Sequence, residues 1–160
     1  MRKMRFALAI ATLLLLPLLS FAAMKPVVKT PEGSKATPDP YEIPDVARER
    51  RNPLSRTDDT LKLGHALWQK HCETCHGTQG RGDGPNARLH EQRRGHAPRN
   101  LTEARVQENL TDGEIFWRIT KGLIEDGKII MPSYEQKIPV ERDRWQLVLF
   151  VRELGQPAKR

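Results

Sequence analysis

The residues best suited to chemistry in this 160-residue chain form the run Cys72-Glu73-Thr74-Cys75-His76. Two thiols separated by two residues can add to the two vinyl groups of one haem. A histidine directly after the second thiol is then held beneath the iron, where it can serve as an axial ligand. The spacing therefore predicts one covalently attached haem c, bound through Cys72 and Cys75, with His76 as the proximal ligand.

The two cysteines are the only ones in the chain, and three other uses are open to such a pair. In an oxidising compartment they could form a disulfide. They could also exchange electrons as a dithiol, but a thioredoxin-like motif belongs beside a βαβ pattern, and the flanking pattern here is helical. A structural zinc site would need about four ligands, and the other histidines lack the paired spacing of such sites. Those histidines are His65, His71, His90 and His96.

Three helical patterns surround the candidate residues, and no stretch shows the sustained alternation typical of strands. The first helix is expected over residues 58–72, with Thr57 as its N-cap. The second begins with the capping-box pair Thr111 and Glu114, and the third lies between Pro139 and Gly155. We therefore expect an all-α domain over residues 58–157. Met131 falls in the loop between the second and third helices.

Several segments of the chain resemble the class I c-type cytochromes, specifically the monohaem bacterial kind, and they follow one another in the order found in that family. The resemblance covers residues 57–156 and implies a small cytochrome c fold, in which the N- and C-terminal helices cross around one haem. It places Gly64 and Trp68 near Trp145, and a tight crossing would explain a glycine within a helix. The matching segments are residues 64–68, 72–77, 80–85, 98–102, 110–122, Met131-Pro132 and the Trp145 helix.

The resemblance also implies that Met131, in a Met-Pro turn, is the distal ligand of the iron. Elimination among the four methionines agrees. Met1 and Met4 lie in residues 1–22, which have the features of a signal peptide, and Met24 would lie beside the N-terminus that cleavage of this peptide creates. Methionine usually fills cores, but a core residue is less expected in a loop before a proline. Cytochromes c use such His/Met pairs.

In this family a proline carbonyl accepts a hydrogen bond from the proximal histidine and so fixes the ring. Pro98 is the candidate for this role in the present chain. Pro85 also precedes an asparagine and is the alternative.

Residues 1–22 have the features of a signal peptide, with an apolar run over residues 6–19 and small residues before Ala23. The run approaches the ~18 residues at which a membrane span becomes plausible, so an uncleaved anchor is the alternative. Pro17 and the small residues favour cleavage. In either case the folded domain is expected in the periplasm. The basic residues at the start are Arg2, Lys3 and Arg5.

Residues 23–57 are rich in proline and lack apolar periodicity, which predicts a tail or linker. The segment could lie along a partner or along the domain's own surface, and both alternatives remain open.

The net charge is +7, and removing the three basic residues of the targeting segment leaves 7 − 3 = +4. This excess is too small to indicate nucleic-acid binding. Arginines gather within residues 48–56 and 81–99. They form either a solvated surface or a docking face for an acidic redox partner.

A haem with two strong protein ligands has no open position for oxygen or substrate. We therefore expect an electron carrier rather than an enzyme, acting with unidentified donor and acceptor proteins. It could be free or the haem subunit of a larger respiratory or dehydrogenase complex. Membrane contact is expected only through such a complex or an uncleaved N-terminal segment. The alternative is a ligand-binding or peroxidatic haem protein in which Met131 dissociates readily.

Overall fold

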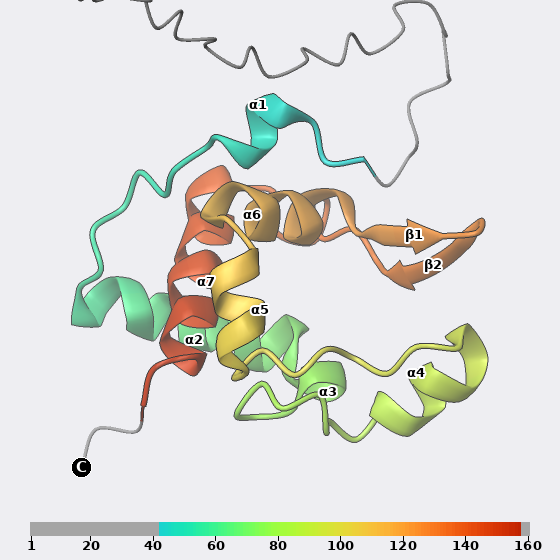
Figure 1. Ribbon diagram of the computed structural model, residues 1–160. Helices are drawn as coiled ribbons and strands as arrows, with labels where there is room; N and C mark the ends of the chain where they lie inside the picture. Colours follow the sequence, from blue (N-terminus) through green and yellow to red (C-terminus); the bar gives the residue numbers. More distant parts are fainter. Residues whose placement is uncertain (1–41, 158–160) are drawn as a thin grey trace, which may run out of the picture. The chain divides into compact units, whose positions relative to one another are not determined.

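The computed structural model describes residues 42–157, and helices predominate in them (Figure 1). The expected all-α class is confirmed. The signal peptide predicted for residues 1–22 lies outside the described residues. The helices are α1 (Asp45–Arg48), α2 (Asp58–His71), α3 (Glu73–His76), α4 (Ala87–Arg94), α5 (Ala104–Asn109), α6 (Asp112–Lys121) and α7 (Glu141–Leu154), and the strands are β1 (Leu123–Glu125) and β2 (Lys128–Met131).

The three predicted helices are confirmed as α2, α6 and α7. Thr57 caps α2 by accepting a hydrogen bond from the backbone N–H of Thr60. The box predicted at α6 is complete, because Thr111 and Glu114 each accept a hydrogen bond from the other's backbone N–H. No helix in the described part of the chain is both long and apolar enough to cross a membrane.

The first and last predicted helices, α2 and α7, pack closely against each other. Gly64 makes this approach possible, because a Cβ at this position would collide with the carbonyl oxygen of Gln146. Gly64 therefore meets the residue after Trp145 rather than Trp145 itself. The predicted crossing explains the helical glycine, which otherwise lowers helix propensity.

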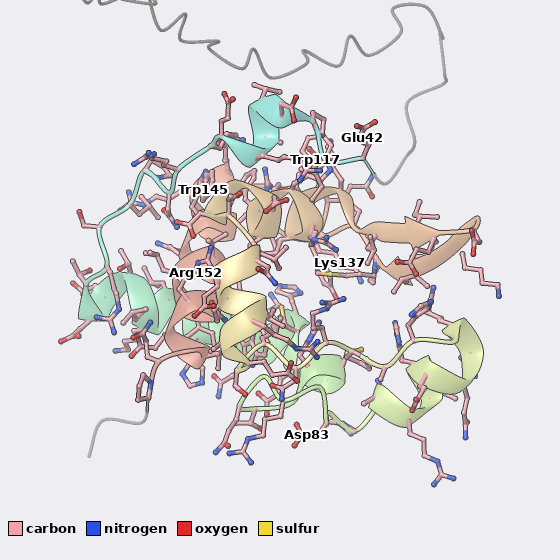
Figure 2. All side chains as sticks on the ribbon, viewed as in Figure 1. Glu42, Asp83, Trp117, Lys137, Trp145 and Arg152 are labelled. Atoms are coloured by element: carbon pink, nitrogen blue, oxygen red, sulfur yellow. The ribbon has the colours of Figure 1, made fainter. Side chains whose placement is uncertain are left out.

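The core lies where α2, α6 and α7 meet. Trp68 and Trp145 are both 1% exposed, and the ring of Phe116 stacks on Trp145 with centroids 4.1 Å apart. Arg152 of α7 points toward α5 (Figure 2) and donates hydrogen bonds to the carbonyl oxygens of Gln107 and Leu110. These contacts fix α5 against α7. The buried core residues are Trp68, Ile115, Phe116, Ile119, Ile138, Trp145, Leu147, Val148 and Val151.

A two-stranded antiparallel hairpin, β1–β2, occupies part of the segment in which the sequence predicted a loop. Asp126 and Gly127 form its turn with φ angles of 49° and 74°. Asp-Gly is a preferred pair for a two-residue hairpin turn, since both positions need positive φ. The strands are too short for alternation to reveal them. Met131 is the last residue of β2.

Residues 42–57, here called the strap, lie along the domain's own surface, which was one of the two alternatives left open. Ile43 and Ala47 are buried at 5% and 4% exposure. Asn52 donates a hydrogen bond to the Trp145 carbonyl oxygen at 2.9 Å, and Arg48 pairs with Glu114 at 2.8 Å. Residues 23–41 lie outside the described residues.

Candidate functional site

Three of the predicted site residues line the same two adjoining cavities. Cys72, His76 and Met131 contribute to a cavity of about 570 Å³ and also to one of about 730 Å³. The larger cavity is lined in addition by Cys75 and Pro98. The fold thus brings together all five residues singled out in the sequence.

The motif is positioned by the end of α2 and the single turn of α3. The Cys72 N–H donates to the Trp68 carbonyl oxygen at 2.8 Å, so the first cysteine closes α2. The Trp68 indole N–H donates to the carbonyl oxygen of Gly77 at 3.2 Å, directly after His76. The buried tryptophan therefore fixes both ends of the motif.

The His76 ring is oriented by one hydrogen bond. Its Nδ1 donates to the carbonyl oxygen of Arg99 at 3.2 Å, which leaves Nε2 as the nitrogen able to bind a metal. Burial lowers the pKa of His76, and the hydrogen bond to Arg99 acts in the opposite direction. The net effect favours the neutral imidazole, which is the metal-binding form.

The carbonyl assigned to Pro98 from the sequence belongs instead to its neighbour Arg99. The Pro98 carbonyl oxygen lies against Gly82, where a Cβ would collide with it. Pro98 lines the larger cavity without accepting this hydrogen bond. Pro85, the alternative, lines a different hollow beside Gly77. The family pattern located the segment, but the carbonyl's direction depends on tertiary packing against Gly82.

Burial raises the pKa of the Cys72 thiol to about 12, and the neighbouring Cys75 adds to the effect. Reactive dithiols need the opposite shift, because the thiolate is the nucleophile. No disulfide joins the two cysteines in the structure. Within residues 42–157 no group of three or more His, Cys, Asp and Glu side chains is arranged to hold a metal ion.

Arg118 of α6 is a site residue that the sequence reasoning missed. It lines the smaller cavity beside mainly apolar side chains, and its Nε is buried with no hydrogen-bond partner among residues 42–157. Burial lowers the pKa of Arg118. The residue as a whole is half-buried, and a buried N–H among apolar groups is stabilised by an acceptor. Haem combines an apolar ring with two carboxylates, and the cavity fits such a group. The sequence feature that could have indicated this role is the position of Arg118 beside Ile115 and Ile119, which belong to the apolar stripe of the same helix.

A family model described as "Cytochrome C oxidase, cbb3-type, subunit III" matches residues 59–151. The chain belongs to this family of c-type cytochromes. The predicted class I c-type cytochrome is thereby confirmed, and with it haem binding and haem-based electron transfer. The matched residues include the motif at Cys72 to His76 as well as Met131.

Two solved structures resemble this cytochrome. One is a chain of the "Kuenenia stuttgartiensis reducing HAO-like protein complex Kustc0457/Kustc0458", with 26% identity and a TM-score of 0.51. The match covers 65% of this chain and 47% of that chain, so this chain spans about half of that relative's length. The other is "KustC0563 c-type cytochrome", with 25% identity, a TM-score of 0.45, and coverage of 58% and 98%. No curated protein matches this cytochrome.

Proposed function

We propose that this cytochrome is a periplasmic electron carrier that holds one haem c through Cys72 and Cys75. His76 and Met131 would bind its iron. The observation that carries the proposal is that Cys72, His76 and Met131 line the same two cavities. When bound, haem supplies reversible one-electron exchange between ferrous and ferric iron.

The protein's contribution is to fix the two ligands and to exclude water. The Arg99 carbonyl holds the His76 ring through Nδ1, which would leave Nε2 available to bind the haem iron. The Met131 thioether favours the ferrous state relative to a second imidazole. With both ligands in place no position remains for oxygen or substrate, so the chain acts as a carrier rather than as an enzyme.

Location and partners belong to the same proposal. Residues 1–22 act as a signal peptide, and the folded domain works in the periplasm with donor and acceptor proteins that contact it weakly and briefly. It is a free carrier or the haem subunit of a respiratory or dehydrogenase complex. The solved relative whose title names a complex supports the subunit version.

N-terminal sequencing of the exported protein should find Ala23 first.

The attachment is tested by producing the protein together with a haem-maturation system and staining a denaturing gel for haem. Wild type should stain and carry one haem per chain, because thioether bonds survive denaturation. The double variant Cys72→Ser/Cys75→Ser should not stain. The matched control, Thr74→Ala between the two cysteines, should stain like wild type. A wild type without covalent haem would contradict the proposal.

A further inference from the structure

The helix α4 adds nothing to the core, since none of its residues is buried. It ends at Gly95, whose φ of 80° is in the left-handed region. Residues 87–96, here called the latch, nevertheless make several polar contacts with the hairpin. Figure 1 shows α4 on the side of the domain that faces β2. Because α4 has no buried residue, its polar contacts with the hairpin are the feature of this helix that points to a role.

His90 makes the central contact of the latch. Its Nε2 lies 2.6 Å from the carbonyl oxygen of Ile130, and its Nδ1 lies 2.9 Å from the carbonyl oxygen of His96. Carbonyl oxygens only accept hydrogen bonds, so each contact needs a hydrogen on the facing nitrogen. The tautomer with hydrogen on Nε2 donates to Ile130, and the imidazolium donates to both carbonyls.

The Ile130 carbonyl is an unusual acceptor because Ile130 is the extra residue of a β-bulge. Leu123 pairs with Met131 and Ile124 pairs with Ile129, so the ladder passes over Ile130. A bulge leaves its extra residue unpaired in the ladder. His90 therefore supplies a hydrogen bond that the hairpin does not provide for itself.

Two further contacts join the latch to the hairpin. The Arg94 guanidinium donates to the carbonyl oxygen of Ile129, the residue before Ile130. The His96 ring lies 3.0 Å from the Glu125 carboxylate on β1. Both strands of the hairpin are thus in contact with the same ten-residue segment.

The hairpin needs such support to fix Met131. A two-stranded hairpin alone is marginally stable in water. After Met131 the chain is anchored to α6, because Ser133 donates to the Thr120 carbonyl oxygen at 2.6 Å and the Tyr134 N–H donates to the Ile119 carbonyl oxygen at 3.0 Å. Before Met131 the bulge interrupts the ladder, and the latch contacts are made at that point.

We propose that His90 is a positioning residue which, as the centre of the latch, holds Ile130 and so keeps Met131 in place at the cofactor site. The inference rests on the proposed function, in which Met131 is the sixth ligand. Without the latch, the strand opens more often and an added ligand can take the position of Met131.

Added imidazole measures this opening directly, because it competes with Met131 for the ferric iron. Its apparent affinity rises with the fraction of molecules in which Met131 is displaced. Loss of the Ile130 hydrogen bond in His90→Ala should make imidazole bind about fivefold to tenfold more tightly. The readout is loss of the far-red sulfur–iron band as imidazole is added.

Two conservative variants separate the role of Nε2 from that of Nδ1. The Gln amide nitrogen reaches about as far as Nε2, so His90→Gln should keep the Ile130 bond and bind imidazole like wild type. The Asn amide is shorter and corresponds to Nδ1, so His90→Asn should behave like His90→Ala. The matched control is His65→Ala, because the exposed His65 ring stacks on Phe150 of α7, away from the hairpin. This control should leave the affinity unchanged.

The outcomes separate the two proposals. Tighter binding in His90→Ala and His90→Asn, with wild-type binding in His90→Gln and His65→Ala, supports the latch. If the wild type shows the sulfur–iron band and all four variants bind imidazole as it does, the latch is wrong and the ligation stands. If the wild type lacks the band, the Met131 ligation fails, and the positioning role fails with it.

Discussion

Arg118 is a single side chain whose surroundings indicate where a cofactor carboxylate would bind. Its Nε is buried without a partner in a cavity lined mainly by apolar groups. Arg118 as a whole is half-buried, and the carboxylates of Glu114 and Glu125 act in favour of its charged form. A carboxylate of the haem would supply the acceptor that the Nε lacks, and the Arg118 charge should then influence the iron.

Arg118→Met should lower the midpoint potential. A positive charge near the haem disfavours the ferric form, which carries one more positive charge, so its removal stabilises that form. The expected shift is roughly 40 mV downward, which corresponds to about 1 kcal/mol of charge interaction. A redox titration followed by visible absorption measures it. Arg142→Met, at an exposed position of α7, is the control and should leave the potential unchanged.

An equal potential in Arg118→Met and wild type would mean that Arg118 does not act on the haem. The orphaned Nε would then need another explanation within α6.

At the scale of elements, the contact between α2 and α7 depends on Gly64. An exposed glycine within a helix normally gains stability when replaced by alanine, by about 1 kcal/mol. Here the new Cβ would collide with the Gln146 carbonyl oxygen, which is backbone and cannot rotate away. Overpacking of this kind costs about 1–3 kcal/mol. The two effects have opposite signs, and the steric one should dominate.

Gly64→Ala is therefore expected to lower the free energy of unfolding by about 1–2 kcal/mol. Urea denaturation followed by circular dichroism measures the change. Gln69→Ala, an exposed position of the same helix, should be neutral. A stabilised Gly64→Ala protein would show that α2 and α7 are not in close contact at this residue.

The sequence predicted the elements whose signals are local. The capping box of Thr111 and Glu114 located the start of α6, and Thr57 located the start of α2. The hairpin was missed although Asp126-Gly127 is a strong turn signal, because its strands are only three and four residues long. The short helices α1, α3, α4 and α5 likewise lack enough turns for periodicity to show.

At the scale of the whole molecule, the strap extends the domain beyond the part that the family model matches, which begins at residue 59. Arg48 pairs with Glu114, a carboxylate at only 7% exposure, and the Thr111 hydroxyl donates to the Arg48 carbonyl oxygen at 2.8 Å. Arg50 lies over the rings of Phe116 and Trp145. The strap thus covers the start of α6 and part of the core.

Arg48→Met should destabilise the domain, because the buried Glu114 carboxylate loses the hydrogen bond and ion pair with Arg48, although the hydrogen bond from the Thr111 N–H remains. The expected loss is about 1–2 kcal/mol in the free energy of unfolding. Urea denaturation again gives the value. The control is Asp45→Asn, since Asp45 is almost fully exposed and its ion pair with Arg48 is long, at 3.9 Å. If Arg48→Met is as stable as this control, the strap does not contribute to folding through Glu114.

The packing of segments that are far apart in the sequence explains what could not be predicted about the site. The attachment motif is local, so its residues could be named from spacing. The contacts of His76 with Arg99, of His90 with Ile130, and of Arg48 with Glu114 join residues that are 23, 40 and 66 positions apart. Such contacts depend on how the elements pack, and no pattern within one element encodes them. Pro98 was assigned in place of Arg99 for this reason.

The central claim is that His76 and Met131 both bind the haem iron, which makes the protein an electron carrier. The visible spectrum of the oxidised haem-loaded protein, recorded for wild type and Met131→Ala, tests it most directly. In the oxidised protein the account predicts low-spin bands with a far-red sulfur–iron band in wild type, and loss of that band in Met131→Ala. After reduction to the ferrous form, carbon monoxide should bind only to the variant. A wild type that is already high-spin, or that binds carbon monoxide readily, would contradict the account and favour a ligand-binding or peroxidatic haem protein.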